Sequence, residues 1–207
     1  ADHAVRRLQH RHRREAARGG SDLCDIIYTS GTTGRSKGVM LTHDMILRAA
    51  YSSALTRAFD DGRRILFAMP MYHVFGYVEC MVAATFVGGA IIPQVEFDPH
   101  AMLDLAEQHA ANEIVAVPVM TMKLIEAARK RGFDAISLHT VFNSGGVNPP
   151  TIWDEIDAVL KPRETVTAYG MTETTASTTC TLPEDGRHRL LTNNGGLKLA
   201  GVAGDPE

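Results

Sequence analysis

Residues 64–117 read RILFAMPMYHVFGYVECMVAATFVGGAIIPQVEFDPHAMLDLAEQHAANEIVAV. Three short apolar runs in this stretch have the length and composition of buried β-strands: 64–69, 90–92 and 114–117. The segments between them are long enough for helices, and Asp98 with Pro99 forms the N-cap and first-turn pair that opens one of them. Strands that alternate with helices of about ten or more residues predict an α/β layered fold, with a largely parallel sheet flanked by helices.

The same alternation continues on both sides of this stretch. Further strands are predicted at 25–29, 39–41, 141–142 and 165–168. Helices are predicted at about 45–58, 74–87, 121–130 and from 149–150 onward. Thr42 and Asp44 offer N-cap oxygens to the first of these helices. The buried side of the last one is expected to come from Trp153, Ile156, Val159 and Leu160. After Thr179 the pattern weakens and no firm structure is predicted, while ligands are expected beyond the carboxyl ends of the strands.

Composition excludes several broad classes of protein. Apolar residues make up 44% of the 207 residues and charged residues 22%, which is typical of a globular chain rather than a disordered or collagen-like one. The net charge of −3 argues against a dedicated nucleic-acid binder. No apolar run approaches the roughly 20 residues of a membrane span. Cys24, Cys80 and Cys180 fit neither a disulfide framework nor a paired metal spacing, which indicates a reducing, cytoplasmic setting.

Charge at the start of the chain and the loss of pattern after Thr179 divide the chain into three predicted regions. Residues 1–20 hold six arginines against two acidic residues, a local charge of +4, so the remainder carries −7. This stretch predicts a basic helical lead-in; a nucleic-acid arm is the less favoured reading, because no aromatic residues interleave the arginines. The α/β core is predicted at 21–180 and an irregular tail at 181–207.

Residues 28–38 read YTSGTTGRSKG and carry the strongest chemical signal in the chain. Glycines let the backbone approach a ligand closely, N–H groups and hydroxyls can donate to phosphate oxygens, and Lys37 supplies a point charge. The segment is not a Walker loop, because two residues separate Gly34 from Lys37 and Gly38 follows the lysine. Eleven residues in this order between two predicted strands favour a phosphate-binding loop over a flexible surface turn.

This loop resembles the phosphate-binding signature of the adenylate-forming superfamily, the AMP-dependent synthetases and ligases. Three further segments match that family in its order: 70–76 (PMYHVFG), 143–147 (NSGGV) and 169–174 (YGMTET). Together the four segments cover about residues 24–180, and the resemblance is closest to acyl-CoA synthetases. It implies that the chain is a central part of the large N-terminal domain of such an enzyme, and that it binds nucleotide and acid within the predicted core.

The resemblance implies a reaction as well as a fold. ATP activates a carboxylic acid to an acyl-adenylate with release of pyrophosphate, and the acyl group then passes to the thiol of CoA, so that ATP, Mg²⁺ and CoA are the implied cofactors. Such a site must bring an anionic carboxylate to an anionic α-phosphate, and must therefore neutralise charge and align the two. Two alternatives stay open: an adenylation domain that delivers to the phosphopantetheine of a carrier protein, and a non-catalytic ATP- and acyl-binding core.

The resemblance also assigns roles to residues of the phosphate loop and of 169–174. The β- and γ-phosphates would be held by Thr29, Ser30, Gly31, Thr32, Thr33, Gly34 and Lys37. Thr172 would donate to the α-phosphate and Glu173 would help to bind Mg²⁺, a hard cation suited to carboxylate and phosphate oxygens. Tyr169, followed by Gly170, would lie against the adenine ring.

The remaining assignments concern adenine and the acid. Gly145 and Gly146 would let the backbone pass close to the adenine ring. His73 would line the acyl tunnel near the reacting carboxylate as an orienting or gating group, and it completes a catalytic set with Lys37, Thr172 and Glu173.

The acid itself is predicted to be apolar. No acidic residue follows His73 before Glu79, and an unpaired buried ammonium would be costly, so an α-amino acid is disfavoured. A fatty or aryl acid fits better, with a slight lean toward fatty because two glycines at 145–146 leave room for a chain. Pocket residues are expected among Val74, Phe75, Val119 and Met120.

Two family features lack a counterpart in these residues. No Thr-Gly-Asp segment is present to hold the ribose, and Gly201–Asp205 lacks that order. The family also has a lysine in its C-terminal domain that contacts the α-phosphate and the substrate carboxylate. Lys198 is not a credible replacement for that lysine by its position. Residues 1–207 in isolation are therefore expected to show negligible adenylation turnover.

Overall fold

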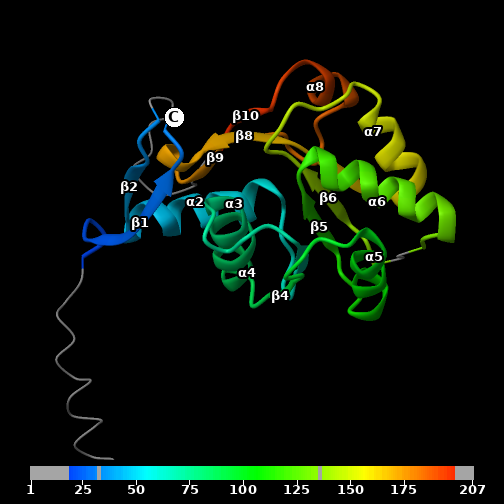
Figure 1. Cartoon of the computed structure of the whole chain (residues 1–207), viewed down its shortest axis with the longest axis horizontal. Helices are drawn as coiled ribbons and strands as arrows, with labels where there is room; N and C mark the ends of the chain where they lie inside the picture. The colour runs from blue at the N-terminus through cyan, green and yellow to red at the C-terminus, as the bar shows by residue number, and fades with distance from the viewer. Residues whose placement is uncertain (1–18, 32–33, 135–136, 199–207) are drawn as a thin grey trace, which may run out of the picture.

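Five parallel strands form the central sheet of the molecule (Figure 1). They are β3 (Arg64–Phe67), β4 (Ala90–Pro93), β5 (Glu113–Ala116), β6 (Thr140–Asn143) and β7 (Glu164–Val166), in the spatial order β4-β3-β5-β6-β7. Both β5 and β6 are buried along their whole length, as expected of parallel strands covered on both faces. This computed structural model describes residues 19–31, 34–134 and 137–198 and confirms the predicted α/β fold class. The basic helix predicted at 1–20 lies almost entirely outside the described residues.

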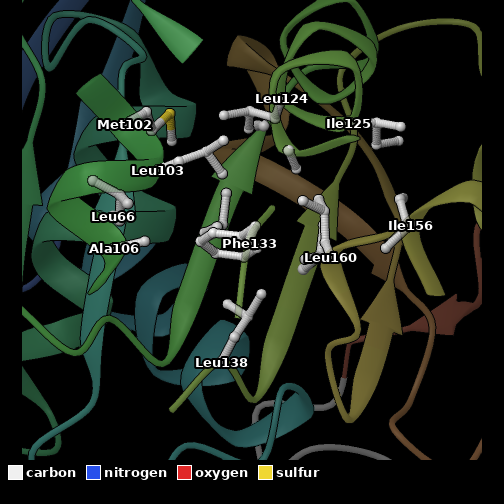
Figure 2. Packing of buried hydrophobic residues seen from close by; sticks show 14 of the residues in the cluster. Leu66, Met102, Leu103, Ala106, Leu124, Ile125, Phe133, Leu138, Ile156 and Leu160 are labelled. Atoms are coloured by element: carbon white, nitrogen blue, oxygen red, sulfur yellow. The ribbon is translucent and has the colours of Figure 1, made fainter. Parts of the chain in front are cut away.

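One face of the sheet is covered by helices from the second half of the chain. They are α5 (Pro99–Gln108), α6 (Pro118–Arg131) and α7 (Ile152–Glu155), the last continued by the π-helical segment η2 (Ile156–Leu160). Figure 2 shows their apolar side chains meeting those of the strands, with Leu66, Leu103, Leu124 and Ile156 in one cluster. The predicted buried side of the α7–η2 segment is confirmed for Trp153, Ile156 and Leu160, while Val159 is partly buried against the same cluster.

The other face is covered by helices from the first half. They are α2 (His43–Thr56), α3 (Val74–Gly76) and α4 (Ala83–Thr85), and the π-helical segment η1 (Tyr77–Val82) joins the last two. Alternate strand residues, including Ile65, Phe67 and Phe142, point to this face and pack with Cys80 and Ala84. The helix predicted over 74–87 is therefore present, but a π-turn widens its middle.

Cap chemistry explains where these helices begin. The Thr42 hydroxyl accepts a hydrogen bond from the N–H of Met45 at 3.3 Å, which confirms Thr42 as the N-cap of α2. Asp44 instead pairs with Arg48 one turn along the helix, at 2.7 Å. Asp98 caps α5 by accepting from the N–H of Ala101 at 2.7 Å. Helix α6 begins at its proline rather than at the predicted residue 121, because proline fits the first turn of a helix.

Two small antiparallel sheets, which the sequence pattern did not predict, accompany the parallel one. The first is a hairpin of β1 (Leu23–Thr29) and β2 (Lys37–Thr42), and the second has the order β10-β9-β8 from β8 (Ala168–Met171), β9 (Ala176–Cys180) and β10 (Gly196–Leu197). The single strand predicted at 165–168 is wrong: it divides at Thr167, whose N–H donates to the Thr181 hydroxyl at 2.9 Å, so that β7 and β8 belong to different sheets.

The region after Thr179 is more ordered than predicted. A helix, α8 (Arg187–Thr192), and the short strand β10 form there, and β10 pairs with the end of β9. Within residues 19–31, 34–134 and 137–198, no helix is both long and apolar enough to cross a membrane.

The order of the central strands places a reversal between β3 and β5. The chain runs from β3 outward to β4 and returns through α5 to β5 on the other side of β3. In open α/β sheets, ligands bind in the crevice outside the carboxyl ends of the strands at such a reversal. A ligand site is therefore expected among the loops that follow β3, β5 and β6.

Candidate functional site

A cavity of about 70 Å³ lies among the loops that follow β3 and β6 and the strands β8 and β9. Its lining residues are His73, Val74, Phe75, Ser144, Gly145, Gly170, Met171, Ala176 and Ser177. Segments 70–76, 143–147 and 169–174, far apart in the sequence, all contribute to this list. The structure thus brings His73, Gly145 and Gly170 of the predicted site together.

His73 is fixed at the start of the helix that follows β3. It is the N-cap of α3, and its Nδ1 accepts a hydrogen bond from the N–H of Phe75 at 3.1 Å. A neutral imidazole that accepts at Nδ1 carries its proton on Nε2. His73 can therefore donate one hydrogen bond to an acceptor such as a carboxylate oxygen, which is the chemistry expected of an orienting group.

The glycine turn after β6 is held by polar contacts on both sides. The Asn143 Oδ1 accepts from the Thr121 hydroxyl at 2.8 Å, and its Nδ2 donates to Asn148 at 2.7 Å. The Ser144 hydroxyl donates to the carbonyl of Ala168 at 2.6 Å, which ties this turn to the start of β8. These bonds fix the position of Gly145 at the cavity.

Strand β8 requires glycine at one position, where it pairs with β9. A Cβ on Gly170 would lie 1.9 Å from the carbonyl oxygen of Ala176, so no larger residue fits without moving a strand. Thr172 is buried and Glu173 is exposed on the 3₁₀ turn η3 (Thr172–Thr174) that follows. Tyr169, with 52% of its surface exposed, is open to a flat partner. Tyr169, Thr172 and Glu173 flank the cavity in sequence but do not line it.

The predicted phosphate loop connects the antiparallel hairpin β1–β2. Thr29 pairs with Lys37 at the end of the hairpin, and Lys37 is exposed. Gly31 has φ +64°, and a Cβ there would lie 2.2 Å from the carbonyl oxygen of Arg35, so the tight bend requires glycine. Thr32 and Thr33 lie outside the described residues.

No loop residue between Thr29 and Lys37 that the structure describes lines the first cavity. A second cavity, of about 590 Å³, lies beside this hairpin and includes Tyr28, Met71 and Tyr72 in its lining. Tyr72 is the neighbour of His73, so one segment borders both cavities. Tyr28, at the start of the phosphate-loop segment, thus shares the second cavity with Met71 and Tyr72, and the adjacent His73 lines the first.

The two glycines of the turn after β6 face different spaces. Gly145 lines the first cavity, whereas Gly146 lines a third one of about 330 Å³. Trp153 of α7 and residues of α8 and its end, including Leu190 and Asn193, also line this third cavity. Helix α8 and its end belong to the region after Thr179 for which no structure was predicted. They therefore lie at the same cavity as Gly146, which is predicted to pass close to adenine.

Only two of the four predicted acyl-pocket residues line the first cavity. Val74 and Phe75 line the first cavity, as expected. Val119 is 58% exposed and Met120 packs into the core on α6, so neither belongs to the cavity lining. Both residues lie on α6, in the first turn after Pro118, and their expected place at the acid stays a prediction.

A buried ionic cluster that the sequence pattern did not predict lies behind the cavity. Its charged members are Arg57, Arg63, Glu79, Glu113 and Lys198. Arg57 donates to Glu113 and lies 3.5 Å from Glu79, Arg63 lies 3.4 Å from Glu113, and Lys198 lies 3.2 Å from Glu79. A signal for it was present, because Glu79 interrupts an apolar run and Glu113 opens one, and an acidic residue in such a place needs a partner.

The two carboxylates of this cluster respond differently to their surroundings. Burial raises the pKa of Glu79, but Lys198, Arg57 and the hydroxyls of Ser177 and Ser53 outweigh it and lower the pKa to about 2. Burial also raises the pKa of Glu113, and Arg57 and Arg63 offset this only in part, so its pKa stays above the ordinary value. Glu79 is therefore held firmly as an anion.

The residues present fit a magnesium ion only in combination with a phosphate ligand. Within the part of the chain that the structure describes, no three histidine, cysteine or acidic side chains gather as a metal site. Mg²⁺ is commonly bound by one or two carboxylates together with substrate phosphates, so the exposed Glu173 is a suitable single protein ligand.

Comparison with known proteins agrees with the arrangement of these segments. A 3-[(3aS,4S,7aS)-7a-methyl-1,5-dioxo-octahydro-1H-inden-4-yl]propanoyl:CoA ligase of Mycobacterium tuberculosis is 34% identical over 172 residues, which are 83% of this chain and 34% of the relative. The putative acyl-CoA synthetase YngI of Bacillus subtilis is 32% identical over 84% of this chain and 32% of its own length. The chain thus spans about a third of the length of these curated relatives.

Solved structures of similar fold cover most of this chain. The N-terminal domain of FACL13 from Mycobacterium tuberculosis matches with a TM-score of 0.80 and 25% identity, over 93% of this chain and 48% of that one. The o-succinylbenzoate CoA synthetase MenE from Bacillus subtilis, in complex with ATP and magnesium ion, matches with a TM-score of 0.76 and 27% identity, over 87% of this chain and 36% of that one. The AMP-binding enzyme family model matches residues 2–202. The chain belongs to the AMP-binding enzyme family.

Proposed function

We propose that this chain carries the ATP- and acid-binding core of an AMP-forming acyl-CoA ligase. The enzyme would convert a carboxylic acid and ATP into an acyl-adenylate and pyrophosphate, and would then transfer the acyl group to the thiol of CoA. The observation that carries the proposal is the cavity to which the separate segments 70–76, 143–147 and 169–174 each contribute. The names of the relatives, which are CoA ligases and synthetases, favour CoA over a carrier protein as acceptor.

The first step joins the acid to the α-phosphate. A carboxylate oxygen attacks the α-phosphorus, and the bond to the oxygen that bridges the α- and β-phosphates breaks, so that pyrophosphate leaves with that electron pair. His73 would orient the carboxylate by donating from Nε2, and Thr172 would donate to the α-phosphate. Lys37 would supply positive charge to the β- and γ-phosphates, which need it most as pyrophosphate departs. Bound Mg²⁺ would add charge neutralisation there.

The rest of the nucleotide would be held by backbone and aromatic groups. Thr29, Ser30, Gly31, Thr32, Thr33 and Gly34 would surround the β- and γ-phosphates. Tyr169 would lie against the adenine ring beside Gly170, and Gly145 and Gly146 would pass close to it. Glu173 would be the protein ligand of Mg²⁺. In the second step the CoA thiolate attacks the acyl carbon, and AMP leaves with the electrons of the carbon–oxygen bond.

The acid would be apolar, either fatty or aryl. Val74 and Phe75 give the cavity an apolar side. Glu79 is fully buried and already accepts hydrogen bonds from Ser177 and Lys198, so it is not available to an ammonium group. This supports the expectation that an α-amino acid is not the substrate.

Acid-dependent exchange of labelled pyrophosphate into ATP tests the proposal, measured on the polypeptide expressed from the intact gene. Exchange should require a carboxylic acid and Mg²⁺. The variants Lys37→Ala and Glu173→Gln should each lower its rate about a hundredfold, the usual loss when one charge-stabilising group is removed. Glu126→Gln on α6 is a matched control, because Glu126 is an exposed acidic residue whose ion pair is with Lys130, outside the candidate site. ATP binding without exchange, for every acid offered, would contradict the proposal and favour a non-catalytic binding core.

A further inference from the structure

Asp25 and Tyr77 join the β1–β2 hairpin to the segment that carries His73. The Tyr77 hydroxyl donates a hydrogen bond to the Oδ2 of Asp25 at 3.2 Å, across 52 positions of the chain. Burial and the neighbouring Asp25 carboxylate raise the pKa of Tyr77 to about 12, so the phenol keeps the proton that this bond needs. Asp25 belongs to β1 and Tyr77 to η1, and both line the second cavity.

Each of these two residues is linked through the backbone to one side of the candidate site. The N–H of Tyr77 donates to the carbonyl of His73 at 3.0 Å, so a shift of one moves the other. Asp25 lies on β1 four residues before Thr29, where the phosphate loop begins, and it pairs with Leu41 of β2. The bond between Asp25 and Tyr77 therefore connects the strand that carries the phosphate loop to the turn that carries His73.

A β-bulge at the start of β1 directs two side chains toward Tyr77. Neighbouring residues of a strand normally point to opposite faces. The register of the hairpin shifts between Leu23 and Asp25, and both Cys24 and Asp25 are partly buried and hydrogen-bond to the Tyr77 hydroxyl. Bulges re-aim side chains and occur often beside active sites. The irregular backbone of β1 thus brings two consecutive side chains to one hydroxyl.

Apolar packing also holds the hairpin against η1, but it fixes the angle of the hairpin only loosely. Ile27 of β1 is partly buried against a cluster that includes Val74 and Val78. Hydrophobic contact is non-directional, whereas a hydrogen bond requires a distance and an angle. Thr29 lies about 13 Å along the strand from Asp25, so a rotation of roughly 5° at Asp25 would move Thr29 by about 1 Å. Misplacement of that size can cost about a hundredfold in rate.

We propose that Asp25 and Tyr77 are positioning residues whose hydrogen bond sets the place of the phosphate loop relative to His73. The bond thereby aligns the α-phosphate with the carboxylate that attacks it. The inference rests on the proposed function and adds a requirement to it, and it assigns to neither residue a contact with the reacting atoms. Without the bond, ATP and the acid would each still meet their own residues, so the alignment of the two should depend on the bond more than the affinity for either.

The test separates alignment from affinity. Acyl-adenylate formation is followed in a single turnover, with the polypeptide expressed from the intact gene in excess over ATP and above its Kd, and with a saturating acid. The rate constant of such a reaction reports the bound complex and not the fraction of protein that is folded. Tyr77→Phe removes only the hydroxyl and should lower this rate constant about tenfold, whereas the Kd for ATP, measured by calorimetry without acid, should stay within about twofold.

Variants of Asp25 supply the rescue and the coupling. Asp25→Asn keeps an acceptor oxygen for the Tyr77 hydroxyl and should keep the rate constant within about twofold of the native value. Asp25→Ala should lower the rate constant about tenfold. The double variant of Asp25→Ala with Tyr77→Phe should be no slower than either single variant, because both changes remove the same bond.

Tyr51→Phe is the matched control, because it removes a phenol hydroxyl from a residue of α2 that lines neither of the first two cavities and packs its ring against Phe86. It should leave both the rate constant and the ATP affinity unchanged. An unchanged rate constant in Tyr77→Phe, an equal loss in Tyr51→Phe or additive losses in the double variant would each overturn the inference while the proposed function stood.

A loss of ATP affinity as large as the loss of rate would also overturn the inference, because the bond would then serve the ATP site alone. Absence of adenylate formation with every acid in the native protein would overturn both the inference and the proposed function. Where Asp25→Ala does not fold, Tyr77→Phe and Asp25→Asn decide the question.

Discussion

The substitution Arg57→Met removes the central cation of the buried cluster. Arg57 donates to Glu113, to the Ser53 hydroxyl at 3.0 Å and to the carbonyl of Glu79 at 2.5 Å. Its guanidinium also lies 4.5 Å from the ring centre of Phe59 and 4.8 Å from that of Phe142. Methionine keeps much of the apolar contact with these rings but none of the charge, so the change isolates the electrostatic role.

The expected loss follows from what remains around Glu113. Its only other charged partner within the described residues is Arg63 at 3.4 Å, and one of its oxygens already lacks a hydrogen-bond partner there. Breaking a buried pair by removing one partner costs about 3–5 kcal/mol, so we expect the free energy of unfolding to fall by about 4 kcal/mol at neutral pH. Domains are stable by only about 5–15 kcal/mol, so the variant should fold but unfold at much lower denaturant.

The loss should depend on pH with a definite sign. The pKa of Glu113 is raised in the fold, because burial outweighs its two arginines. A carboxyl whose folded pKa is raised binds protons more tightly when folded, so its contribution favours the fold at low pH and is lost as pH rises through the folded pKa. Removing Arg57 raises this pKa further. The destabilisation should therefore be largest near about pH 8, where the Glu113 left without Arg57 is ionised, and should shrink as the pH falls and Glu113 binds a proton.

Urea unfolding followed by circular dichroism at several pH values measures the effect. The double variant Arg57→Met with Glu113→Gln is the control, because it removes both partners and should recover about half of the loss. A single variant as stable as the native protein at about pH 8, with the same unfolding slope, would refute the reasoning. A loss that grew as the pH fell toward 5 would refute the assignment to Glu113.

Three further predictions follow from other contacts. Asp98→Ala removes the cap that accepts from the N–H of Ala101 and should lower the free energy of unfolding by about 1 kcal/mol, whereas Asp98→Asn, measured by the same urea titration, should lose less. Trp153→Ala empties a site with 2% exposure between α7 and the sheet and should cost about 3–5 kcal/mol by thermal or urea unfolding; a loss under about 1 kcal/mol would contradict its place in the core. Lys37→Ala should weaken ATP binding by about tenfold in calorimetry with no change in the melting temperature of the free protein, because Lys37 is exposed; equal affinity would remove it from the phosphate site.

The sequence predicted the fold well where local patterns determine it. Apolar runs such as 114–117 and cap pairs such as Asp98-Pro99 act within a few residues, and the structure confirms both. The antiparallel sheets were not predicted, because pairing between β8 and β9 depends on a break at Thr167 that is set by a distant hydroxyl, that of Thr181. Strand β10 likewise depends on pairing with the distant end of β9, and the Asn and Gly residues at 193–196 carry no strand pattern.

The site was predictable in its segments but not in its supports. His73, Gly145 and Gly170 carry recognisable local patterns, and they meet at one cavity. Glu79, Arg57 and Glu113 carry none, because a buried ion pair joins residues that are 22 to 56 positions apart and leaves no spacing to recognise.

Charge within an apolar run is nevertheless a usable sign of such a cluster. Glu79 lies within an apolar helix and Glu113 opens a strand that is buried throughout. An ionised carboxylate in such a place is stable only with a buried cation beside it, so each acid requires at least one partner elsewhere in the chain. Arg57 and Arg63 supply the partners of Glu113, and Lys198 with Arg57 those of Glu79. A carboxylate within an apolar run, or at the start of one, therefore predicts a buried cation beside it. Only the fold determines which residue supplies that cation.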